Sequence, residues 1–522
     1  MFAFAPTEER LGETVPSSRL VDALARHARH RPESVALFLA ERQVTYRQLA
    51  ESAERLSRTL KCLRLPVDQP LCVPAHKSPE TIALLIAAFS AGHSVLVPSP
   101  ELGAEPLRTL CAQARCSYIL TADQGGLHAT EAALDAQAAE GFARVDPAGA
   151  QLLLTTSGST GTPKIVPIPT AAFDRFADWA TDRFGLTDTD TALSYAPLNF
   201  DLSLLDVWTF LLLGARVVLV EQARSTDARH LRELLGTHEV TFVQGVPMLY
   251  RLLTEDALSP AGDSAAPGSL TPDTAVYKQA TTVIFTGDVM PQALLRTTGT
   301  AFPAARFHNV FGCTETNDSF LHEVDPATAG PALPIGRPLA GVRALLLDEN
   351  GQVLVGPGTG ELLVSTPFQT TGYLQLARNE GVFVPAPDGS EAVFYRTGDV
   401  VTRDAEGLYF LQGRADFQVK VRGVRTNVLE VESVLSAHPD VAEAAVVALP
   451  DLEAGYKLHA QVTRRPGSTL SSLRLRSYSA KNLPRHAIPS SVTVNDTPLP
   501  RISTGKPDRT LIKNNRLKGK AE

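Results

Sequence analysis

The chain has 522 residues, which is more than one hydrophobic core usually serves, so its length favours two or more domains. Hydrophobic residues at 44% and charged residues at 20% are typical of a globular protein and exclude bulk disorder. A formal net charge of −7, without a Lys/Arg run interleaved with aromatic residues, argues against a nucleic-acid partner.

Cysteine content and apolar runs bear on the compartment. Five cysteines with no CxxC pair are too few to cross-link a chain of this length and predict reduced thiols. The acidic N-terminal segment lacks the apolar core of a secretion signal. The longest apolar stretch, residues 82–91, is too short to cross a bilayer. We therefore expect a soluble cytoplasmic protein without a membrane partner.

Short aliphatic runs alternate along the chain with longer segments of helical spacing. The segment ALLIAAFSAGH (residues 83–93) predicts a helix, and SVLVP (residues 94–98) predicts the strand that follows it. The same alternation recurs in FLLLGA (residues 210–215) and RVVLVE (residues 216–221). Alternation of this kind predicts an α/β fold with parallel sheets flanked by helices.

Other segments have the composition of loops or turns. Residues 121–149 are expected to form a loop-like region before the strand QLLLTT (residues 151–156), and residues 259–273 an exposed insertion inside a domain. The alternating pattern of GRADFQVKVRGVR (residues 413–425) predicts a hairpin. The basic C-terminal tail is expected to be poorly ordered.

The strongest chemical signal is TTSGSTGTPK (residues 155–164), a strand that runs into a loop of glycines and hydroxylated residues and ends in lysine. The N–H groups and hydroxyls of such a loop, together with Lys164, suit a phosphate chain. It is not a Walker A loop, because Gly161 is followed by Thr-Pro-Lys. Taken alone, the segment also fits a flexible turn.

This loop resembles the phosphate loop of the adenylate-forming superfamily, which comprises acyl-CoA synthetases, luciferases and adenylation domains of nonribosomal peptide synthetases. Further segments match that family in order: NFDLS (199–203), NVFGCTETN (309–317), GEL (360–362), YRTGD (395–399), GRADFQVKVRGVR (413–425) and STGKPDR (503–509). The resemblance implies an α/β N-terminal domain (1–415) of β-sheets flanked by helices, with a small β-barrel-like subdomain. It also implies a smaller, mobile α+β C-terminal domain (416–522).

The resemblance further implies that ATP and Mg²⁺ activate a carboxylic acid. Lys506 would bridge the substrate carboxylate and the nucleotide, Thr314 would contact the α-phosphate, and Glu315 would hold Mg²⁺. Such groups offset the charge that builds on phosphate oxygens when a carboxylate attacks the α-phosphorus. Phe311 would stack on adenine and Asp399 would accept both ribose hydroxyls. The remaining nucleotide-binding candidates are Thr155, Thr156, Ser157, Gly158, Ser159, Thr160, Gly161, Lys164, Asn309, Gly312 and Arg414.

Asp201 matches the aspartate by which amino-acid-activating members bind the substrate ammonium, and a buried carboxylate needs such a partner. In isolation, Asp201 also fits a helix cap. The polar members of the implied pocket favour a small or polar amino acid, because an apolar side chain would leave them unpaired. The other pocket positions are Phe200, Leu202, Leu205, Gln244, Ile284, Thr286, Gly287, Val310, Asp318 and Ser319.

Asp318 is the most informative departure from the family pattern. If it faces the pocket, it pairs with a second amine, with the displaced amine of a β-amino acid, or with a hydroxyl. If it turns away, it bonds to backbone, and the sequence leaves both orientations open. The TETN run also resembles prolyl-adenylating enzymes, whose following residues are apolar, so proline is an alternative that is not preferred. Cys313 stands where relatives commonly have proline and is interpreted as a packing residue.

The resemblance implies two conformations about a hinge at Asp416: one brings Lys506 to the site, and the other forms the thioester. Gly423 would line the tunnel for a phosphopantetheine arm. The chain contains no GGHS-type attachment site, so the expected acceptor is a discrete carrier protein of an antibiotic or other natural-product pathway. Free CoA is the rival acceptor. A non-catalytic nucleotide-binding regulatory protein is the rival class, and the intact motif residues argue against it.

Overall fold

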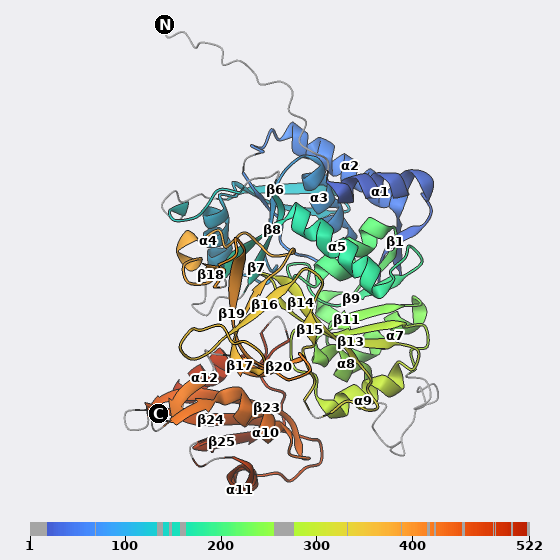
Figure 1. Cartoon of the computed structure of the whole chain (residues 1–522). Helices are drawn as coiled ribbons and strands as arrows, with labels where there is room; N and C mark the ends of the chain where they lie inside the picture. Colours follow the sequence, from blue (N-terminus) through green and yellow to red (C-terminus); the bar gives the residue numbers. More distant parts are fainter. Residues whose placement is uncertain are drawn as a thin grey trace, which may run out of the picture.

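The computed structural model describes residues 18–67, 69–132, 139–145, 149–156, 163–254, 276–330, 332–387, 389–414, 418–421, 424–451, 455–483, 485, 487–502 and 505–518. The strands of these residues form four sheets, three in a large N-terminal domain and one in a small C-terminal domain (Figure 1). The α/β class predicted from the alternation of helical and strand segments is confirmed.

A mostly parallel sheet, nine-stranded in the described part of the chain, forms one half of the large domain. Its strands, in order across the sheet, are β15 (Arg337–Pro338), β14 (Asn317–Val324), β13 (Arg306–Cys313), β12 (Thr282–Phe285), β11 (Phe242–Gly245), β9 (Thr191–Ser194), β10 (Arg216–Leu219), β1 (Val35–Leu39) and β2 (Arg42–Thr45). Its helices are α1 (Arg19–His30), α5 (Thr170–Phe184), α6 (Phe210–Leu213), α7 (Ala228–Thr237), α8 (Pro247–Thr254) and α9 (Gln292–Ala301). The helix and strand predicted in residues 210–221 correspond to α6 and β10 and are confirmed.

Helices cover both faces of this sheet because its strand residues alternate between two apolar layers. Val243 and Val283 pack in the layer that contains α7, α8 and α9, whereas their neighbours Phe242 and Ile284 pack in the layer that contains α5. Helix α7 begins where the carboxylate of Asp227 accepts the N–H of His230, a standard N-cap.

A second sheet has six strands in the described residues and carries the predicted phosphate loop between two of them. The strands, in order across the sheet, are β6 (Gly126–Glu131), β5 (Tyr118–Asp123), β3 (Leu71–Cys72), β4 (Val95–Val97), β7 (Ala150–Thr156) and β8 (Lys164–Pro169). Its helices are α2 (Tyr46–Cys62), α3 (Pro79–Ser90) and α4 (Ala104–Ala114). The predicted helix and strand at residues 83–98 are confirmed as α3 and β4.

The loop predicted for residues 121–149 is wrong over its first part. Strands β5 and β6 pair antiparallel as a hairpin through residue 131. The carboxylate of Asp123 accepts the N–H groups of Gly125 and Gly126, which closes the turn. The polar composition that indicated a loop instead belongs to an edge strand whose side chains are largely exposed.

A third, barrel-like sheet completes the large domain, with strands β16 (Arg343–Leu347), β17 (Gly358–Ser365), β18 (Phe383–Pro385), β19 (Val393–Arg403) and β20 (Tyr409–Arg414). The C-terminal domain lies below it in Figure 1. Its elements are β21 (Gln418–Val421), β22 (Val424–Asn427), α10 (Val428–Ser436), β23 (Val441–Asp451), β24 (Gly455–Arg464), α11 (Ser472–Asn482), β25 (Ser491–Asn495) and α12 (Arg509–Lys518). The antiparallel pair β21 and β22 confirms the hairpin predicted near residue 420.

The prediction of a poorly ordered basic tail is wrong through residue 518. Helix α12 occupies this segment, and Ile512 is buried with Val447 and Leu499 of the C-terminal domain. The Asp508 carboxylate accepts the N–H of Leu511 and caps the helix. One apolar anchor and a cap therefore outweigh the basic composition. The insertion predicted at residues 259–273 lies outside the described residues.

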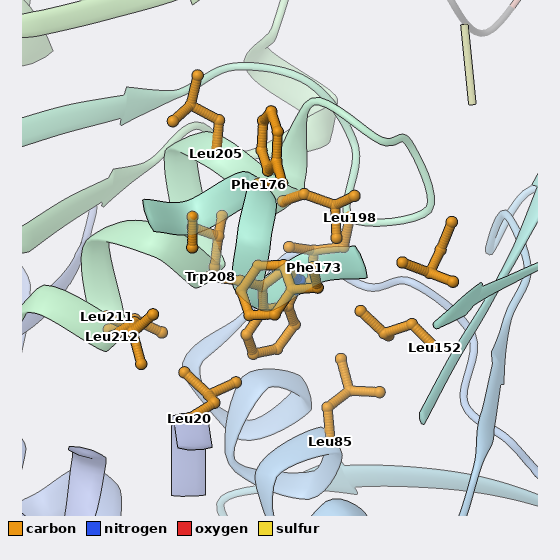
Figure 2. Packing of buried hydrophobic residues seen from close by; sticks show 14 of the residues in the cluster. Leu20, Leu85, Leu152, Phe173, Phe176, Leu198, Leu205, Trp208, Leu211 and Leu212 are labelled. Atoms are coloured by element: carbon orange, nitrogen blue, oxygen red, sulfur yellow. The ribbon is translucent and has the colours of Figure 1, made fainter. Parts of the chain in front are cut away.

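The largest apolar core lies between the first two sheets and includes Phe176 and Leu205, which also line the cavity between the two domains. Figure 2 shows Trp208 packed among Phe173, Leu85 and Leu152, which come from three different elements. Trp208 belongs to a short π-helical segment, Leu204–Thr209, that runs directly into α6. Close packing of this kind makes the core next to the cavity rigid. In the described residues, no helix combines the length and apolar character needed to span a bilayer.

Candidate active site

A cavity of about 940 Å³ opens between the two domains. One wall is formed where the parallel strands β9, β11, β12 and β13 end, by residues that include Tyr195, Gln244, Thr286 and Gly312. The opposite wall comes from the C-terminal domain and includes Lys506. The carboxyl ends of parallel strands are the usual ligand-binding edge of an α/β sheet, so this cavity is the candidate active site.

Asp201 lies in the loop after β9 and lines this cavity. Its Oδ1 accepts the N–H of Leu202 at 3.0 Å, and its carboxylate also accepts a hydrogen bond from the hydroxyl of Thr314. Burial raises the pKa of Asp201, with a further contribution from Glu315, while the Thr314 bond and the charge of Lys506 act in the opposite direction. A cationic group in the cavity would favour the ionised form of this carboxylate.

Asp318 lines the same cavity at the start of β14. Burial, and secondarily the charge of Asp201, raise the pKa of Asp318 to about 7. Its backbone N–H is bonded to Oδ1 of Asn317, whose φ of 56° lies in the left-handed region. The turn between β13 and β14 thus places a second carboxylate in the cavity.

Glu315 is buried at the turn that follows β13 and also lines the cavity. The hydroxyl of Tyr373 donates to its Oε1 at 2.5 Å, and Nζ of Lys164 lies 3.2 Å from that same hydroxyl oxygen. Lys164 also lies over the Tyr373 ring, 4.7 Å from its centroid. Lys164 at the end of the predicted phosphate loop is thereby connected through one tyrosine to the predicted magnesium ligand.

Lys506 occupies the end of a tight turn in the C-terminal domain. The N–H of Ile502 donates to the Lys506 carbonyl at 3.0 Å, and the N–H of Gly505 donates to the Ile502 carbonyl at 2.9 Å. Gly505 has a φ of 81°, which favours glycine at this position. The exposed Lys506 side chain therefore projects from a closed turn and acts electrostatically on Asp201 across the cavity.

The other predicted nucleotide-binding residues divide into two groups. Thr156 and Gly312 line the cavity, and Thr155 precedes Thr156 in β7. Three described candidates do not line it: Asn309 donates to the Pro334 carbonyl, Phe311 packs edge-on against Phe320, and Asp399 pairs with Arg414 in the backbone ladder of β19 and β20. The remaining predictions, at Ser157, Gly158, Ser159, Thr160, Gly161, Asp416 and Gly423, lie outside the described residues.

The predicted substrate positions divide in the same way. The cavity is lined by Phe200, Leu202, Leu205, Gln244, Thr286 and Gly287, beside the two aspartates. Ile284 and Val310 are instead buried in the apolar core. The Ser319 hydroxyl is buried and bonded to Thr316 and to the Asn317 carbonyl. Neighbouring strand residues face opposite sides of the sheet, so a sequence motif carries both lining and core residues.

Sequence reasoning missed a cluster of charged residues at the domain junction. Arg251 of α8 contacts Glu443 of β23, with 2.7 Å between Nη1 and Oε1, and Arg501 bonds to the same carboxylate. All three residues line the cavity. Only Arg501 lies near a recognised motif, five positions before Lys506. Glu443 and Arg251 are far apart in sequence, so no local signal could have paired them.

A buried charged pair beneath the cavity was also missed. Lys77 donates to the Ser194 carbonyl at 2.8 Å, and Asp206 of the π-helical segment is fully buried beside it. Burial lowers the pKa of Lys77 and raises the pKa of Asp206, while each charge partly offsets the effect on the other. The pair is next to the cavity along the chain, because Ser194 and Asp206 are the sequence neighbours of Tyr195 and Leu205, which line the cavity.

The chemistry of the cavity fits a nucleotide-bound magnesium ion better than a metal held by protein alone. In the part of the chain that the structure describes, no group of three or more His, Cys, Asp or Glu side chains gathers to hold a metal. Mg²⁺ commonly takes one or two carboxylates and completes its shell with water and substrate phosphates. Glu315, a single buried carboxylate beside the predicted phosphate loop, fits that requirement.

Comparisons with known proteins show the family of this chain. The sequence profile of the AMP-binding enzyme family matches residues 24–374, and that of the AMP-binding enzyme C-terminal domain matches residues 430–506. The chain belongs to the AMP-binding enzyme family. It is an adenylate-forming ligase of the superfamily that the sequence motifs resemble.

Among its relatives, the L-proline–[L-prolyl-carrier protein] ligase of Pseudomonas fluorescens is 29% identical, over 95% of this chain and 98% of the relative. Tyrocidine synthase 3 of Brevibacillus parabrevis is 30% identical over 92% of this chain, which spans only 7% of that relative. Among solved structures, the anthranilate–CoA ligase AuaEII in complex with anthranoyl-AMP superposes with a TM-score of 0.77. That match is 21% identical and covers 97% of this chain and 99% of AuaEII, so it bears on the fold alone.

Proposed function

We propose that this ligase uses ATP and Mg²⁺ to convert the carboxylate of a small or polar amino acid into an aminoacyl-AMP, and then transfers the aminoacyl group to the phosphopantetheine thiol of a separate carrier protein. One observation carries the proposal: Asp201 and Glu315 from the large domain and Lys506 from the small domain line one cavity. An ammonium partner, a carboxylate partner and a metal ligand are thus available together.

The residues of the cavity suggest how the first half-reaction proceeds. Asp201 binds the substrate ammonium and so directs the substrate carboxylate toward Lys506. A carboxylate oxygen then forms a bond to the α-phosphorus of ATP while the bond to the bridging oxygen breaks, and pyrophosphate leaves with that electron pair. Lys506 and Thr314 offset the negative charge of the transition state. Glu315 would hold Mg²⁺ in this site, and the ion would supply Lewis-acid neutralisation of phosphate charge.

In the second half-reaction, the thiol sulfur attacks the acyl carbon and AMP leaves. We propose that the C-terminal domain rotates about Asp416 between the two steps and that Gly423 lines the thiol's path. Because Lys506 projects from a separate domain, moving that domain would withdraw the lysine without disturbing Asp201. The wider set of predicted contacts, in which Phe311 stacks on adenine and Asp399 holds the ribose, belongs to the same proposal.

The polarity of the pocket supports a small or polar substrate. Gln244 and Thr286 line the cavity beside the two aspartates, and an apolar side chain would leave these groups unpaired. The name of the Pseudomonas relative specifies L-proline. Proline offers only one ammonium to two carboxylates, so it is a less suitable substrate here.

Pyrophosphate exchange with a panel of amino acids tests the proposal. Exchange that requires both an amine-bearing acid and Mg²⁺ is the expected result. Binding of ATP without exchange for any acid would contradict it and favour a regulatory nucleotide-binding role. To identify the acceptor, the loaded enzyme is mixed with candidate carrier proteins or with CoA, and the mass increase is measured. We expect the increase on a carrier protein, and an increase on CoA alone would overturn that part.

A further inference from the structure

Asp318 has no role in adenylation as described above, yet its position is tightly fixed. It lies opposite Gly312 in the β13–β14 ladder. A Cβ at Gly312 would stand 2.2 Å from the carbonyl oxygen of Asn317, so the two strands approach as closely as a glycine permits. The side-chain carbonyl of Asn317 also holds the Asp318 N–H at 2.8 Å. The backbone therefore sets Asp318 against the cavity by two independent constraints.

The Asp318 carboxylate lacks a cationic partner in the described protein. Among the residues that the structure describes, no ion pair or hydrogen bond reaches its side-chain oxygens. Asp201 in the same cavity repels it, and burial disfavours its ionised form. A half-buried carboxylate without a partner is still disfavoured in its ionised form, and a bound cation would relieve that penalty.

Among the described residues, the cations that line the cavity do not supply this partner. Arg464 is paired with Asp496, at 2.6 Å between Nε and Oδ1, and the arginines at the domain junction are bound by Glu443. Lys506 acts on Asp201 and is needed for the substrate carboxylate. An acid with one ammonium leaves one aspartate uncompensated. An acid with two ammonium groups compensates both aspartates while its carboxylate meets Lys506.

We propose that the substrate of this enzyme is a diamino acid, with the ammonium nearer the carboxyl bound by Asp201 and the second ammonium bound by Asp318. This inference rests on the proposed function and specifies its substrate class. Gln244 and Thr286 beside the aspartates can accept the remaining N–H groups of the two ammonium ions. A β-amino acid, whose single displaced amine is shared by both aspartates, and a hydroxy amino acid are the alternatives that the test separates.

The test measures pyrophosphate exchange with 2,3-diaminopropionate, 2,4-diaminobutyrate, ornithine and lysine, against serine, homoserine, alanine and β-alanine. We expect one diamino acid to exceed its matched hydroxy and monoamino analogues by roughly 10²-fold in kcat/KM, because each analogue leaves Asp318 unpaired. Preference for an acid with a single amine would overturn the inference while leaving the proposed function intact. No exchange with any acid would instead contradict the proposed function.

Matched variants locate the effect. Asp318→Asn keeps the shape but removes the charge, and we expect it to lose roughly 10²-fold in kcat/KM for the diamino acid and little for its monoamino analogue. Glu323→Gln, an exposed change on the same strand, is expected to retain the preference. Calorimetric titration with the diamino acid should show weaker binding to Asp318→Asn than to wild type or to Glu323→Gln. An equal loss on both substrates in Asp318→Asn would show a structural role and overturn the proposal.

A different observation supports a second inference, about the cluster at the domain junction. The carboxylate of Glu443 forms ion pairs with Arg251 of the large domain and with Arg501 of its own domain. The other guanidinium nitrogen of Arg501 donates to the Gly505 carbonyl, next to Lys506. The Leu499 N–H also approaches Oε2 of Glu443 at 3.4 Å. One carboxylate thus connects the large domain to the turn that carries the lysine.

We infer that Glu443 is a positioning residue that holds the Lys506 turn in place for adenylation and is released for thioester formation. Arg251 is the part of this cluster contributed by the large domain, so its removal should loosen the adenylating arrangement without altering the turn itself. Small displacements of a catalytic group reduce rates severely, and we expect Arg251→Ala to lower the adenylation kcat about tenfold. This inference also depends on the proposed two-step function.

The two half-reactions distinguish positioning from general destabilisation. With supplied aminoacyl-AMP, Arg251→Ala should transfer to the carrier at the wild-type rate or faster, and Arg251→Lys should recover part of the adenylation rate. Arg229→Ala, which removes an exposed pair within α7, is the control and should change neither rate. Equal losses in both half-reactions, or no loss in either, would overturn the inference.

Discussion

The two walls of the cavity differ in how they present charge. The large-domain wall holds Asp201 and Asp318 half-buried, and partial burial raises the pKa of both carboxylates. This wall adjoins a core packed around Trp208. The small-domain wall presents Lys506 as an exposed side chain on a turn fixed by hydrogen bonds and by Arg501. Under the proposed function, the large domain would recognise the substrate with partly desolvated groups in a rigid frame. The small domain would supply the catalytic charge from a group that a domain movement could withdraw.

Replacing Lys506 should produce the largest effect, because it removes the charge that the small-domain wall presents. Lys506→Ala removes the cation that offsets charge in the first transition state, and we expect adenylate formation to fall roughly 10²–10³-fold. Transfer from supplied aminoacyl-AMP should persist. Rapid-quench measurement of each half-reaction checks this, and an equal loss in both would contradict withdrawal of the lysine.

The rigidity of the large-domain wall can be tested through the buried pair behind it. Lys77→Met leaves Asp206 buried without its cation, and we expect a loss of about 3–5 kcal/mol in the free energy of unfolding. Denaturant titration of wild type, Lys77→Met and the double variant Lys77→Met/Asp206→Leu measures it. The double variant should recover most of the stability, and failure to recover would mean that the lysine itself, rather than the charge balance, was needed.

The contact between Tyr373 and Glu315 predicts a smaller effect. Tyr373→Phe removes the hydroxyl that donates to Glu315 and accepts from Lys164, so the carboxylate loses one of its fixed partners. We expect half-maximal pyrophosphate exchange to require roughly tenfold more Mg²⁺, because such supporting contacts tune metal affinity by about 10–100-fold. A magnesium titration at saturating ATP measures it. An unchanged midpoint would show that Glu315 needs no such orientation.

The raised pKa of Asp318 predicts a pH-dependent difference in stability. Between the ordinary carboxyl range and about pH 7, the folded state holds a proton that the unfolded chain has lost, so stability falls as pH rises through this window. Asp318→Asn removes this penalty. Without substrate, the Tm of the variant minus that of wild type should therefore increase between about pH 5 and pH 8. A constant Tm difference across that range would contradict the buried, unpaired carboxylate.

The extent of sequence-based prediction differs between fold and site. The periodic segments at residues 83–98 and 210–221 were predicted correctly because local apolar spacing reports helices and buried strands. The hairpin of β5 and β6 and the helix α12 were misread, because one turn contact and one buried isoleucine decide each against a polar composition. Sequence motifs could nominate Asp201, Glu315 and Lys506 one by one. They could not determine that Ile284 and Ser319 are buried away from the cavity.

By itself, the sequence determined the family and the α/β class and nominated the candidate site residues, because these depend on residue types at fixed local spacing. The tertiary structure decided what those groups experience. It set Asp318 beside Asp201 in one cavity and joined Arg251 to the Lys506 turn through Glu443. Burial and charge repulsion act through space between residues distant in the chain, so no linear pattern contains them.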